Sequence, residues 1–222
     1  QDLCLSGDSQ RFIQGLKDSG MFWEENQRVD RLQSALIDGY RQYFNGLQRA
    51  LIPASPDFQC LTAISEGVGG RRMINHLAQV ETQRLGLNGF GERLLVTANQ
   101  PGIGVFNGDI GIVIDSYDSP NPRVRFDNLD QPLRKNQLGS VESAWAISIH
   151  RSQGSEYQSV FICLPEPSTS QSRFKPSREH VYTALTRAKE SIRLFATESM
   201  IDRAISQTTC RVTCLDHFLN AS

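Results

Sequence analysis

Hydrophobic positions recur every three or four residues over residues 28–51, which is the spacing of one face of an α-helix. The pattern predicts a single long amphipathic helix that Pro53 ends, because proline cannot continue a helix. A shorter helix is expected over residues 9–17, with Ser6 or Asp8 as its N-terminal cap. The apolar positions of the long helix are Val29, Leu32, Leu36, Tyr40, Phe44, Leu47 and Leu51.

After this helix the pattern changes to that of short β-strands. Residues 58–64 predict a strand, residues 65–70 a turn with three glycines, and residues 71–85 a helix. Three more strands follow, separated by glycine, proline and asparagine. Because such closely spaced strands pair with antiparallel neighbours, we expect a small antiparallel barrel, which we place at residues 108–141. The three strands are residues 92–98, 109–115 and 123–127.

The last third of the chain has the pattern of an α/β fold. Residues 143–149 and 159–164 are nearly continuous apolar runs, as expected for strands buried on both faces of a parallel sheet. Residues 165–172 are rich in proline, serine and threonine and predict a surface loop. The elements expected after this loop are a helix, a strand and a helix, over residues 176–189, 192–196 and 198–205. The sequence therefore predicts an α/β protein with a mainly parallel sheet.

The composition is that of an ordinary globular protein, with 39% hydrophobic and 21% charged residues among 222. A formal net charge of −1 excludes the overall basic character of many free-standing DNA-binding domains, so any nucleic-acid site must be local. Such a patch is predicted between residues 173 and 193, where six basic residues stand against two acidic ones. The six are Arg173, Lys175, Arg178, Arg187, Lys189 and Arg193.

The five cysteines form no C-x-x-C pair, which is typical of reduced thiols in the cytosol. Cys210 and Cys214 have helical spacing, but His217 alone does not complete a zinc site, so no metal ligands are predicted. No apolar run approaches the roughly 20 residues that a membrane span requires, and a signal peptide is lacking. The absence of an initial methionine indicates an excised fragment.

The segment His150-Arg-Ser-Gln-Gly-Ser-Glu156 is a polar stretch directly after a buried strand. Ligands of parallel α/β sheets bind at loops that leave the carboxyl ends of the strands. Ser152 and Gln153 can bond phosphate or sugar oxygens, and Gly154 lets a ligand approach the backbone. Glu156 can accept a hydrogen bond from a ribose hydroxyl. The alternative is an ordinary polar turn with a capping serine.

The segment Val181-Tyr-Thr-Ala-Leu-Thr-Arg-Ala-Lys189 predicts a helix that presents Arg187. An arginine delivered to a γ-phosphate stabilises the charge that develops during phosphoryl transfer. The alternative is a surface arginine paired with Glu190.

The segment Val105-Phe-Asn-Gly-Asp-Ile-Gly111 predicts an Asn-Gly hairpin turn. Phe106 and Asn107 are in addition candidates to face a single nucleic-acid strand, because aromatic rings stack on bases of any sequence. The turn and a DNA contact are compatible, and the residues alone do not decide whether Phe106 and Asn107 contact DNA.

Together these segments resemble superfamily 1 DNA helicases of the RecD type, the alpha chain of exodeoxyribonuclease V. Residues 150–156 are similar to helicase motif V and residues 182–189 to motif VI. Residues 106–111 are similar to the element that enters an inserted SH3-like barrel. The resemblance runs from about residue 24 to residue 205, with the three motifs in the family's order and spacing.

The resemblance does not extend to the first half of such a motor. A Walker A loop, G-x-x-x-x-G-K-[ST], supplies the lysine that neutralises the phosphates. This chain has four lysines, and none follows a glycine. The Walker B acidic pair and the motif IV arginine also find no counterpart. The chain alone is therefore expected to hydrolyse no ATP.

The resemblance implies an α/β fold of the P-loop NTPase type: a RecA-like second motor lobe with three layers and a mainly parallel sheet. It carries an inserted small SH3-like β-barrel. Residues 1–107 would be the first part of the lobe and residues 108–141 the barrel. Residues 142–222 would be the second part, with motifs V and VI.

The family also implies roles for individual residues. Arg187 would be catalytic and contact the γ-phosphate, with Gly154 and Glu156 beside the nucleotide. The DNA track would be lined by Asn107, His150, Ser152, Gln153 and Thr183. The cofactors would be ATP and Mg²⁺, bound mainly by an N-terminal motor lobe of the same polypeptide.

The implied activity is 5′-to-3′ movement along single-stranded DNA, with the beta and gamma chains of exodeoxyribonuclease V as partners. The process would be double-strand break repair and recombination in the bacterial cytoplasm, without a membrane. The rival hypothesis is a non-catalytic nucleic-acid or protein interaction module that uses the β-barrel. A Walker A loop upstream of Gln1 would support the motor, and its absence would support the module.

Overall fold

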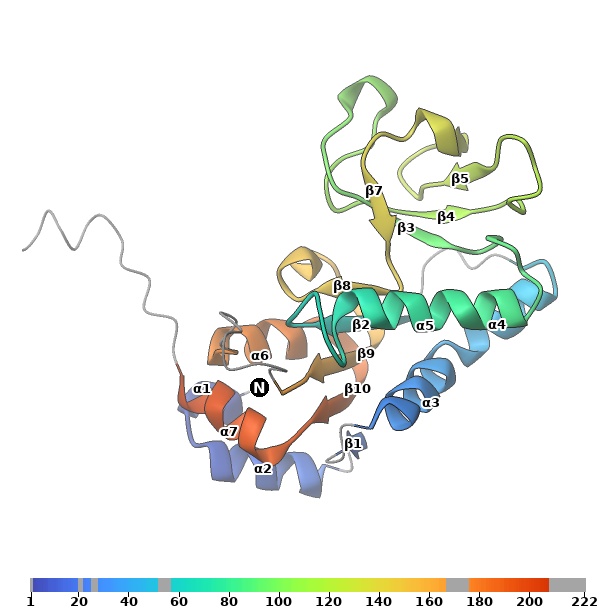
Figure 1. Ribbon diagram of the computed structural model, residues 1–222. Helices are drawn as coiled ribbons and strands as arrows, with labels where there is room; N and C mark the ends of the chain where they lie inside the picture. Colours follow the sequence, from blue (N-terminus) through green and yellow to red (C-terminus); the bar gives the residue numbers. More distant parts are fainter. Residues whose placement is uncertain (1, 20–21, 25–27, 52–56, 167–175, 208–222) are drawn as a thin grey trace, which may run out of the picture.

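The computed structural model describes residues 2–19, 22–24, 28–51, 57–166 and 176–207. It contains a parallel and an antiparallel sheet, each of five strands, with the antiparallel sheet standing above the rest in Figure 1. Most of the loop expected at 165–172 lies outside the described residues, as do Cys210, Cys214 and His217. In the described segments, no helix combines the length and apolarity needed to span a bilayer.

The parallel sheet has the strand order β1-β10-β9-β2-β8, and all neighbouring strands run in the same direction. The prediction of an α/β protein with a parallel sheet is therefore confirmed. The strands are β1 (Phe22–Glu24), β2 (Phe58–Thr62), β8 (Ala146–Ser148), β9 (Tyr157–Leu164) and β10 (Ala188–Ala196).

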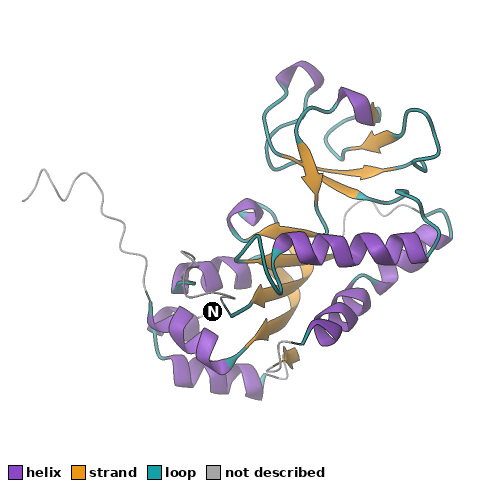
Figure 2. Cartoon of the chain, in the orientation of Figure 1, coloured by secondary structure: helices purple, strands orange, loops and turns teal. Residues whose placement is uncertain are grey.

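Helices cover both faces of the parallel sheet (Figure 2). Side chains alternate along its strands: Leu61 and Ile162 belong to one buried cluster, whereas Cys60 and Phe161 belong to the other. The first cluster is covered by α1 (Asp2–Ser6), α2 (Ser9–Asp18), α6 (Arg178–Leu185) and α7 (Glu198–Ser206). The second is covered by α3 (Val29–Gly39), α4 (Arg41–Gln48) and α5 (Arg71–Arg84).

The antiparallel sheet lies within the connection from β2 to β8, after α5. Its strand order is β6-β5-β4-β3-β7, and it has its own buried cluster around Val113, Val124 and Phe126. Within 93–143, a stretch described without gaps, no ladder joins the edge strands β6 and β7, so a closed barrel is not seen. The strands are β3 (Arg93–Val96), β4 (Ile110–Val113), β5 (Arg123–Arg125), β6 (Leu133–Arg134) and β7 (Val141–Ser143).

The antiparallel pairing reaches further along the chain than the segment 108–141. Strand β3 precedes residue 108 and pairs with both β4 and β7. The sheet therefore spans residues 93–143.

The prediction of one helix over residues 28–51 is wrong, because the helix breaks at Tyr40. Tyr40 has φ −87° and ψ 5°, and it separates α3 from α4. Its ring is buried against Trp145, and its hydroxyl donates to the Trp145 carbonyl. A side chain at Gly39 would collide with the Phe58 ring. The apolar spacing runs through the break because α3 and α4 bury their sides in the same cluster, whereas Leu51 is exposed.

Other boundaries also differ from the prediction. The run 143–149 is divided between β7 and β8, which belong to different sheets. The helix predicted over 176–189 ends at Leu185, and β10 begins at Ala188, because the Arg187 carbonyl already accepts from the Tyr157 amide. The short elements α1 and β1 were not predicted. Asp8 caps α2 by accepting from the Arg11 amide, as expected.

Candidate functional site

The motif V segment begins with a 3₁₀ turn, η3 (His150–Ser152), directly after β8. Ser152 is fully buried, and its hydroxyl donates to the Ile149 carbonyl at 2.7 Å. The expectation that Ser152 lines a DNA track is therefore corrected, because its side chain stabilises the turn from inside. Gln153 and Gly154 are exposed, and Gly154 has φ +88°, a conformation that favours glycine.

Arg187 lies in the turn between α6 and β10 rather than in a helix. Its Nη1 donates to the Ser155 carbonyl at 3.1 Å, and its Nε donates to the Thr183 carbonyl at 3.2 Å. Nη2 donates to Thr186 Oγ1 at 3.1 Å. These contacts join the motif V and motif VI segments. They replace the pairing with Glu190 that was the alternative for this arginine.

The motif V segment begins at the carboxyl ends of the parallel strands and finishes at their amino ends. His150 follows the carboxyl end of β8, where Ser148 pairs with the last residue of β2. Tyr157 and Ala188 begin β9 and β10 and pair with each other. Gly154, Glu156 and Arg187 therefore gather near the amino ends of these two strands. The expectation that the whole segment lies at the carboxyl ends is wrong.

Glu156 and Lys189 form an ion pair beside Arg187. Glu156 Oε2 lies 3.3 Å from Lys189 Nζ, and both side chains are more than half exposed, at 59% and 52%. Exposed pairs contribute at most about 1 kcal/mol, so either partner is free to exchange for a ligand. One carboxylate and two cations thus lie together near the amino ends of β9 and β10.

His150 and His180 meet at the other end of the segment. Their Nε2 atoms lie 3.2 Å apart, and His180 Nδ1 lies 2.7 Å from Ser177 Oγ. Burial lowers the pKa of His180, and the neighbouring His150 lowers it further. Thr183 is half-buried one turn further along α6, so it and His180 share one side of the helix.

Glu142 of β7 ties the antiparallel sheet to the motif V turn. One of its oxygens, Oε2, accepts from Arg151 Nη1 at 2.8 Å and also from Arg71 at the start of α5. Burial acts to raise the pKa of Glu142, but the Arg151 hydrogen bond and the two positive charges overcome this effect and lower it. Sequence reasoning missed these three residues, because no local pattern signals a contact between positions so far apart.

Asn107 lies in a turn of the antiparallel sheet. The Asp109 amide donates to the Phe106 carbonyl at 3.0 Å, which confirms the predicted turn. Asn107 and Phe106 are exposed, Phe106 by 48%. Asn107 and residues 150–153 follow strands of different sheets. Contact with DNA stays a prediction.

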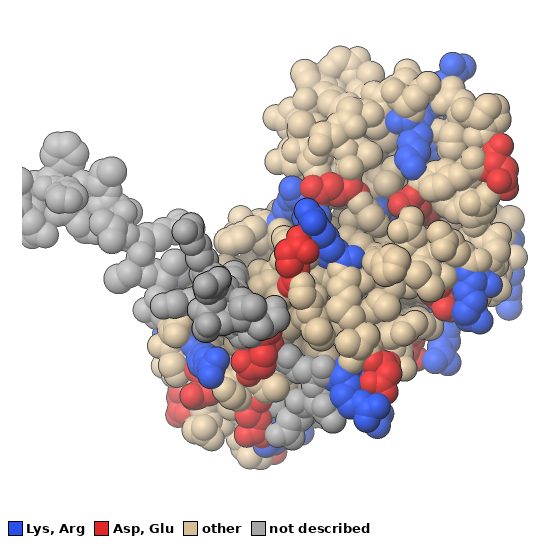
Figure 3. Space-filling view, viewed as in Figure 1, with Lys and Arg blue, Asp and Glu red and all other residues tan. Residues whose placement is uncertain are grey.

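The basic residues between 173 and 193 do not form one continuous patch. Arg193 pairs with Asp38 of α3, and Arg178 donates to the Ile205 carbonyl of α7. Arg173 and Lys175 lie outside the described residues. On the face shown in Figure 3, basic and acidic side chains lie next to one another, without a broad field of one sign.

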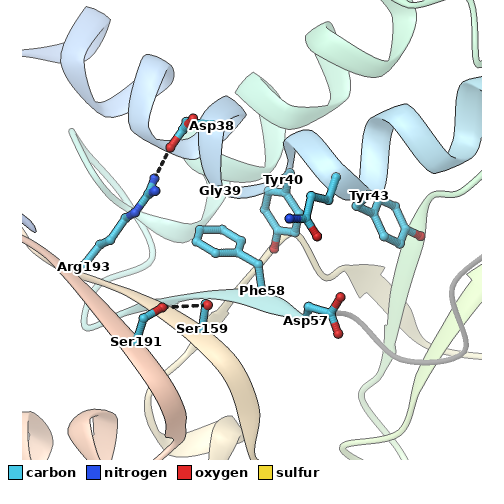
Figure 4. Close-up of a pocket in the computed structure, with 10 residues that line it drawn as sticks. Asp38, Gly39, Tyr40, Tyr43, Asp57, Phe58, Ser159, Ser191 and Arg193 are labelled. Carbon is cyan, nitrogen blue, oxygen red and sulfur yellow. Dashed lines mark hydrogen bonds and ion pairs between the residues drawn. The ribbon is translucent and has the colours of Figure 1, made fainter.

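A pocket of about 330 Å³ lies between the α3–α4 junction and the amino ends of β2, β9 and β10. The Asp38–Arg193 ion pair and a hydrogen bond from Ser191 to Ser159 Oγ, 2.7 Å long, form part of its wall (Figure 4). None of the site residues expected from the sequence lines it.

Residues 143–195 match the family model of the UvrD-like helicase C-terminal domain. This span includes η3, the motif V segment, α6 and Arg187, so the similarity to a helicase C-terminal domain covers the candidate site. Curated relatives that the chain resembles over part of its length are named as RecD subunits or RecD-type helicases.

One such relative is RecBCD enzyme subunit RecD of Mycobacterium tuberculosis, 35% identical over 125 residues, 56% of this chain and 21% of the relative. Another is RecD of Haemophilus influenzae, 34% identical over 131 residues, 58% of this chain and 18% of the relative. The ATP-dependent RecD2 DNA helicase of Deinococcus radiodurans is 33% identical over 100 residues, 45% of this chain and 13% of the relative. The matched region is about a fifth of the length of the first two.

Two solved structures of helicases are also similar. Bacteroides Pif1 bound to ssDNA has a TM-score of 0.42 and 16% identity, with 83% of this chain and 53% of that chain covered. Pif1 helicase from Candida albicans has a TM-score of 0.42 and 15% identity, with 82% and 57% covered.

Proposed function

We propose that the chain is the second, RecA-like motor lobe of an ATP-dependent DNA helicase of the exodeoxyribonuclease V alpha-chain type. The observation that carries the proposal is the hydrogen bond from Arg187 to the Ser155 carbonyl, which joins the motif V and motif VI segments at the amino ends of β9 and β10. Hydrolysis of a nucleotide beside Arg187 would drive 5′-to-3′ movement along single-stranded DNA.

Arg187 has the electrostatics that a γ-phosphate contact requires. Its three hydrogen-bond acceptors are neutral oxygens, and no salt bridge to it is found among the described residues. Two of the five guanidinium N–H donors therefore remain for a ligand. A positive charge without a carboxylate partner is suited to the charge that develops on phosphate oxygens in the transition state. Gly154 and Glu156 would contact the nucleotide beside it.

ATP and Mg²⁺ would be held mainly by an N-terminal motor lobe of the same polypeptide. The residues of this chain fit only part of that task, because no lysine follows a glycine. In the described segments, no group of three or more His, Cys, Asp or Glu residues has a geometry suited to a metal. This chain would therefore contribute the arginine, and the other lobe would contribute the metal and phosphate ligands.

The DNA track would run past the η3 turn and α6. His150 and Gln153 are exposed there, and Thr183 is half-buried. Ser152 would act by holding the turn. The antiparallel sheet over residues 93–143 would be the SH3-like barrel insertion of the family. Asn107 would then contact the DNA strand from a different side than η3 and α6 do. The lobe would then consist of the segments before and after this sheet.

The partners proposed for the whole protein are single-stranded DNA and the beta and gamma chains of exodeoxyribonuclease V. The support is that several relatives are subunits of the RecBCD enzyme. The corresponding process is repair of double-strand breaks by recombination in the bacterial cytoplasm. An interaction module that uses only the antiparallel sheet would leave the joined motifs without a role.

The test is the ATPase activity of the longer polypeptide that carries a Walker A lobe. Arg187→Ala should lower kcat about a thousandfold and leave the affinity for single-stranded DNA nearly unchanged, because the arginine acts in the transition state. Arg84→Ala, an exposed arginine on α5, is the control and should keep the parent's kcat. An Arg187→Ala variant with near-normal kcat would contradict the proposal and favour the interaction module.

A further inference from the structure

The contact between His150 and His180 has the geometry of two metal ligands. The Nε2 atoms face each other at 3.2 Å, and the ring planes are inclined by 76°. In a tetrahedral site with metal–nitrogen bonds of about 2.0–2.1 Å, two ligand nitrogens lie about 3.3–3.4 Å apart. The observed Nε2–Nε2 distance is therefore within a few tenths of an ångström of the ligand spacing of a tetrahedral site.

The hydrogen bond to Ser177 orients His180 for this role. When Nδ1–H donates to Ser177 Oγ at 2.7 Å, the lone pair of His180 lies on Nε2 and points at His150. Histidine ligands in metal sites are held in the same way, with the second ring nitrogen donating to an oxygen. In that tautomer and without a metal, the Nε2–H of His150 donates to Nε2 of His180. On metal binding, that proton would move to Nδ1 of His150.

We propose that His150 and His180 form a two-histidine site for a divalent transition metal, of which Zn²⁺ is the probe of choice. Imidazole nitrogen suits Zn²⁺, Cu²⁺ and Ni²⁺. Because the described residues provide no third ligand at this place, water would fill the remaining positions on the exposed His150 side. Such a site is exchangeable rather than structural. Metal bound there links the motif V turn to α6 and occupies the ring nitrogen of His150.

The test is a calorimetric titration of the whole chain with ZnCl₂. Cys210→Ser and Cys214→Ser are included throughout, because thiolates also bind Zn²⁺ and these residues lie outside the described part. The parent should bind one equivalent, and His180→Gln should bind it at least tenfold more weakly or not at all. His76→Gln, which removes an exposed histidine of α5, should bind as the parent does.

His150→Gln provides a second variant that does not disturb a buried side chain, since His150 is exposed. It should lose the same equivalent of Zn²⁺. The proposal would be overturned if either ring variant bound Zn²⁺ as tightly as the parent. It would also be overturned if His76→Gln lost the binding instead. Because the readout is metal binding, the result does not depend on ATPase activity or on DNA.

Discussion

At the scale of single residues, Arg93 is the least expected feature of the chain. This arginine of β3 is completely buried, and no ion pair to it is found in the part of the chain that the structure describes. Its charge is met by neutral groups: Gln59 Oε1 accepts from Nη2 at 2.6 Å and the Tyr40 hydroxyl accepts from Nη1 at 2.9 Å. Nε is buried without an acceptor among the described residues. Arg93 thereby joins the antiparallel sheet to β2 and to the junction of α3 and α4.

Removing one acceptor of Arg93 should therefore be costly. Tyr40→Phe should lower the free energy of unfolding by about 2–3 kcal/mol, because hydrogen bonds to charged groups are stronger than neutral ones. Tyr43→Phe is the matched control: its hydroxyl donates to the neutral Gly91 carbonyl at 2.8 Å, so the expected loss is about 1 kcal/mol. Urea denaturation of both variants measures the difference. Equal losses would show that Tyr40 does not stabilise the buried charge.

The lowered pKa of His180 predicts a dependence of stability on pH. Its pKa in the folded chain lies below the ordinary value of 6.5, so just below pH 6.5 the unfolded chain binds more protons. This contribution to stability is complete above pH 6.5 and is lost as the pH falls through the lowered pKa. His180→Gln should therefore lose less stability than the parent between pH 7.5 and 5.5.

Urea midpoints measured at both pH values, with a chelator present to exclude metal, provide the measurement. His76→Gln should follow the parent. If His180→Gln lost as much stability as the parent in acid, the His150–His180 contact would not be the acid-sensitive element.

At the scale of elements, most strands of the parallel sheet could be located along the chain, because burial on both faces leaves nearly uninterrupted apolar runs such as residues 159–164. The break at Tyr40 was not, since α3 and α4 keep a common apolar side through it. The division of residues 143–149 was hidden for a related reason. Ala144 and Trp145 are as buried as Ala146 and Ile147 of β8, so hydrophobicity did not mark where β8 begins.

Glu142 is the contact through which the antiparallel sheet holds the motif V turn. Glu142→Gln should remove the ion pairs with Arg71 and Arg151 and lower the free energy of unfolding by about 1 kcal/mol, because both pairs are only partly buried. It should also speed amide hydrogen exchange in η3, which then loses a tether to β7.

The control for this prediction is Glu66→Gln. Glu66 pairs with Arg72 in an exposed position, so its loss should change stability by less than about 0.5 kcal/mol. Exchange in η3 that is unchanged in Glu142→Gln would show that the turn is held by its own hydrogen bonds.

At the scale of the whole molecule, the sequence identified the segments that form the site but did not predict where in the sheet they meet. The motif V and VI segments do meet, but at the amino ends of β9 and β10. Residues 149–157 run from the carboxyl ends of the parallel strands back to their amino ends. The ion pairs that neutralise the predicted basic patch join residues remote in sequence, such as Arg193 and Asp38. No single-segment pattern predicts such pairs, so the patch was overestimated.

This distribution of charge leads to a prediction about DNA binding by the chain alone. Since the carboxylates beside Lys189 and Arg193 reduce the local positive charge, single-stranded DNA should bind weakly, without sequence preference, and with a shallow dependence on salt. Asn107 and Gln153 are exposed on separate sheets, so a strand that passes both should lose contacts at two places. Asn107→Ala combined with Gln153→Ala should weaken binding about tenfold, the loss expected for two hydrogen bonds of ordinary strength.

Fluorescence anisotropy with a labelled oligonucleotide at two salt concentrations measures this loss. The matched control combines Asn45→Ala with Gln48→Ala, which removes the same two residue types from exposed positions on α4, and it should bind as the parent does. The single variants should each lose less than the double variant if one strand contacts both sheets. A double variant that bound as well as the control would mean that these two residues do not form the track. Asn107 would then serve only the turn that leads into β4.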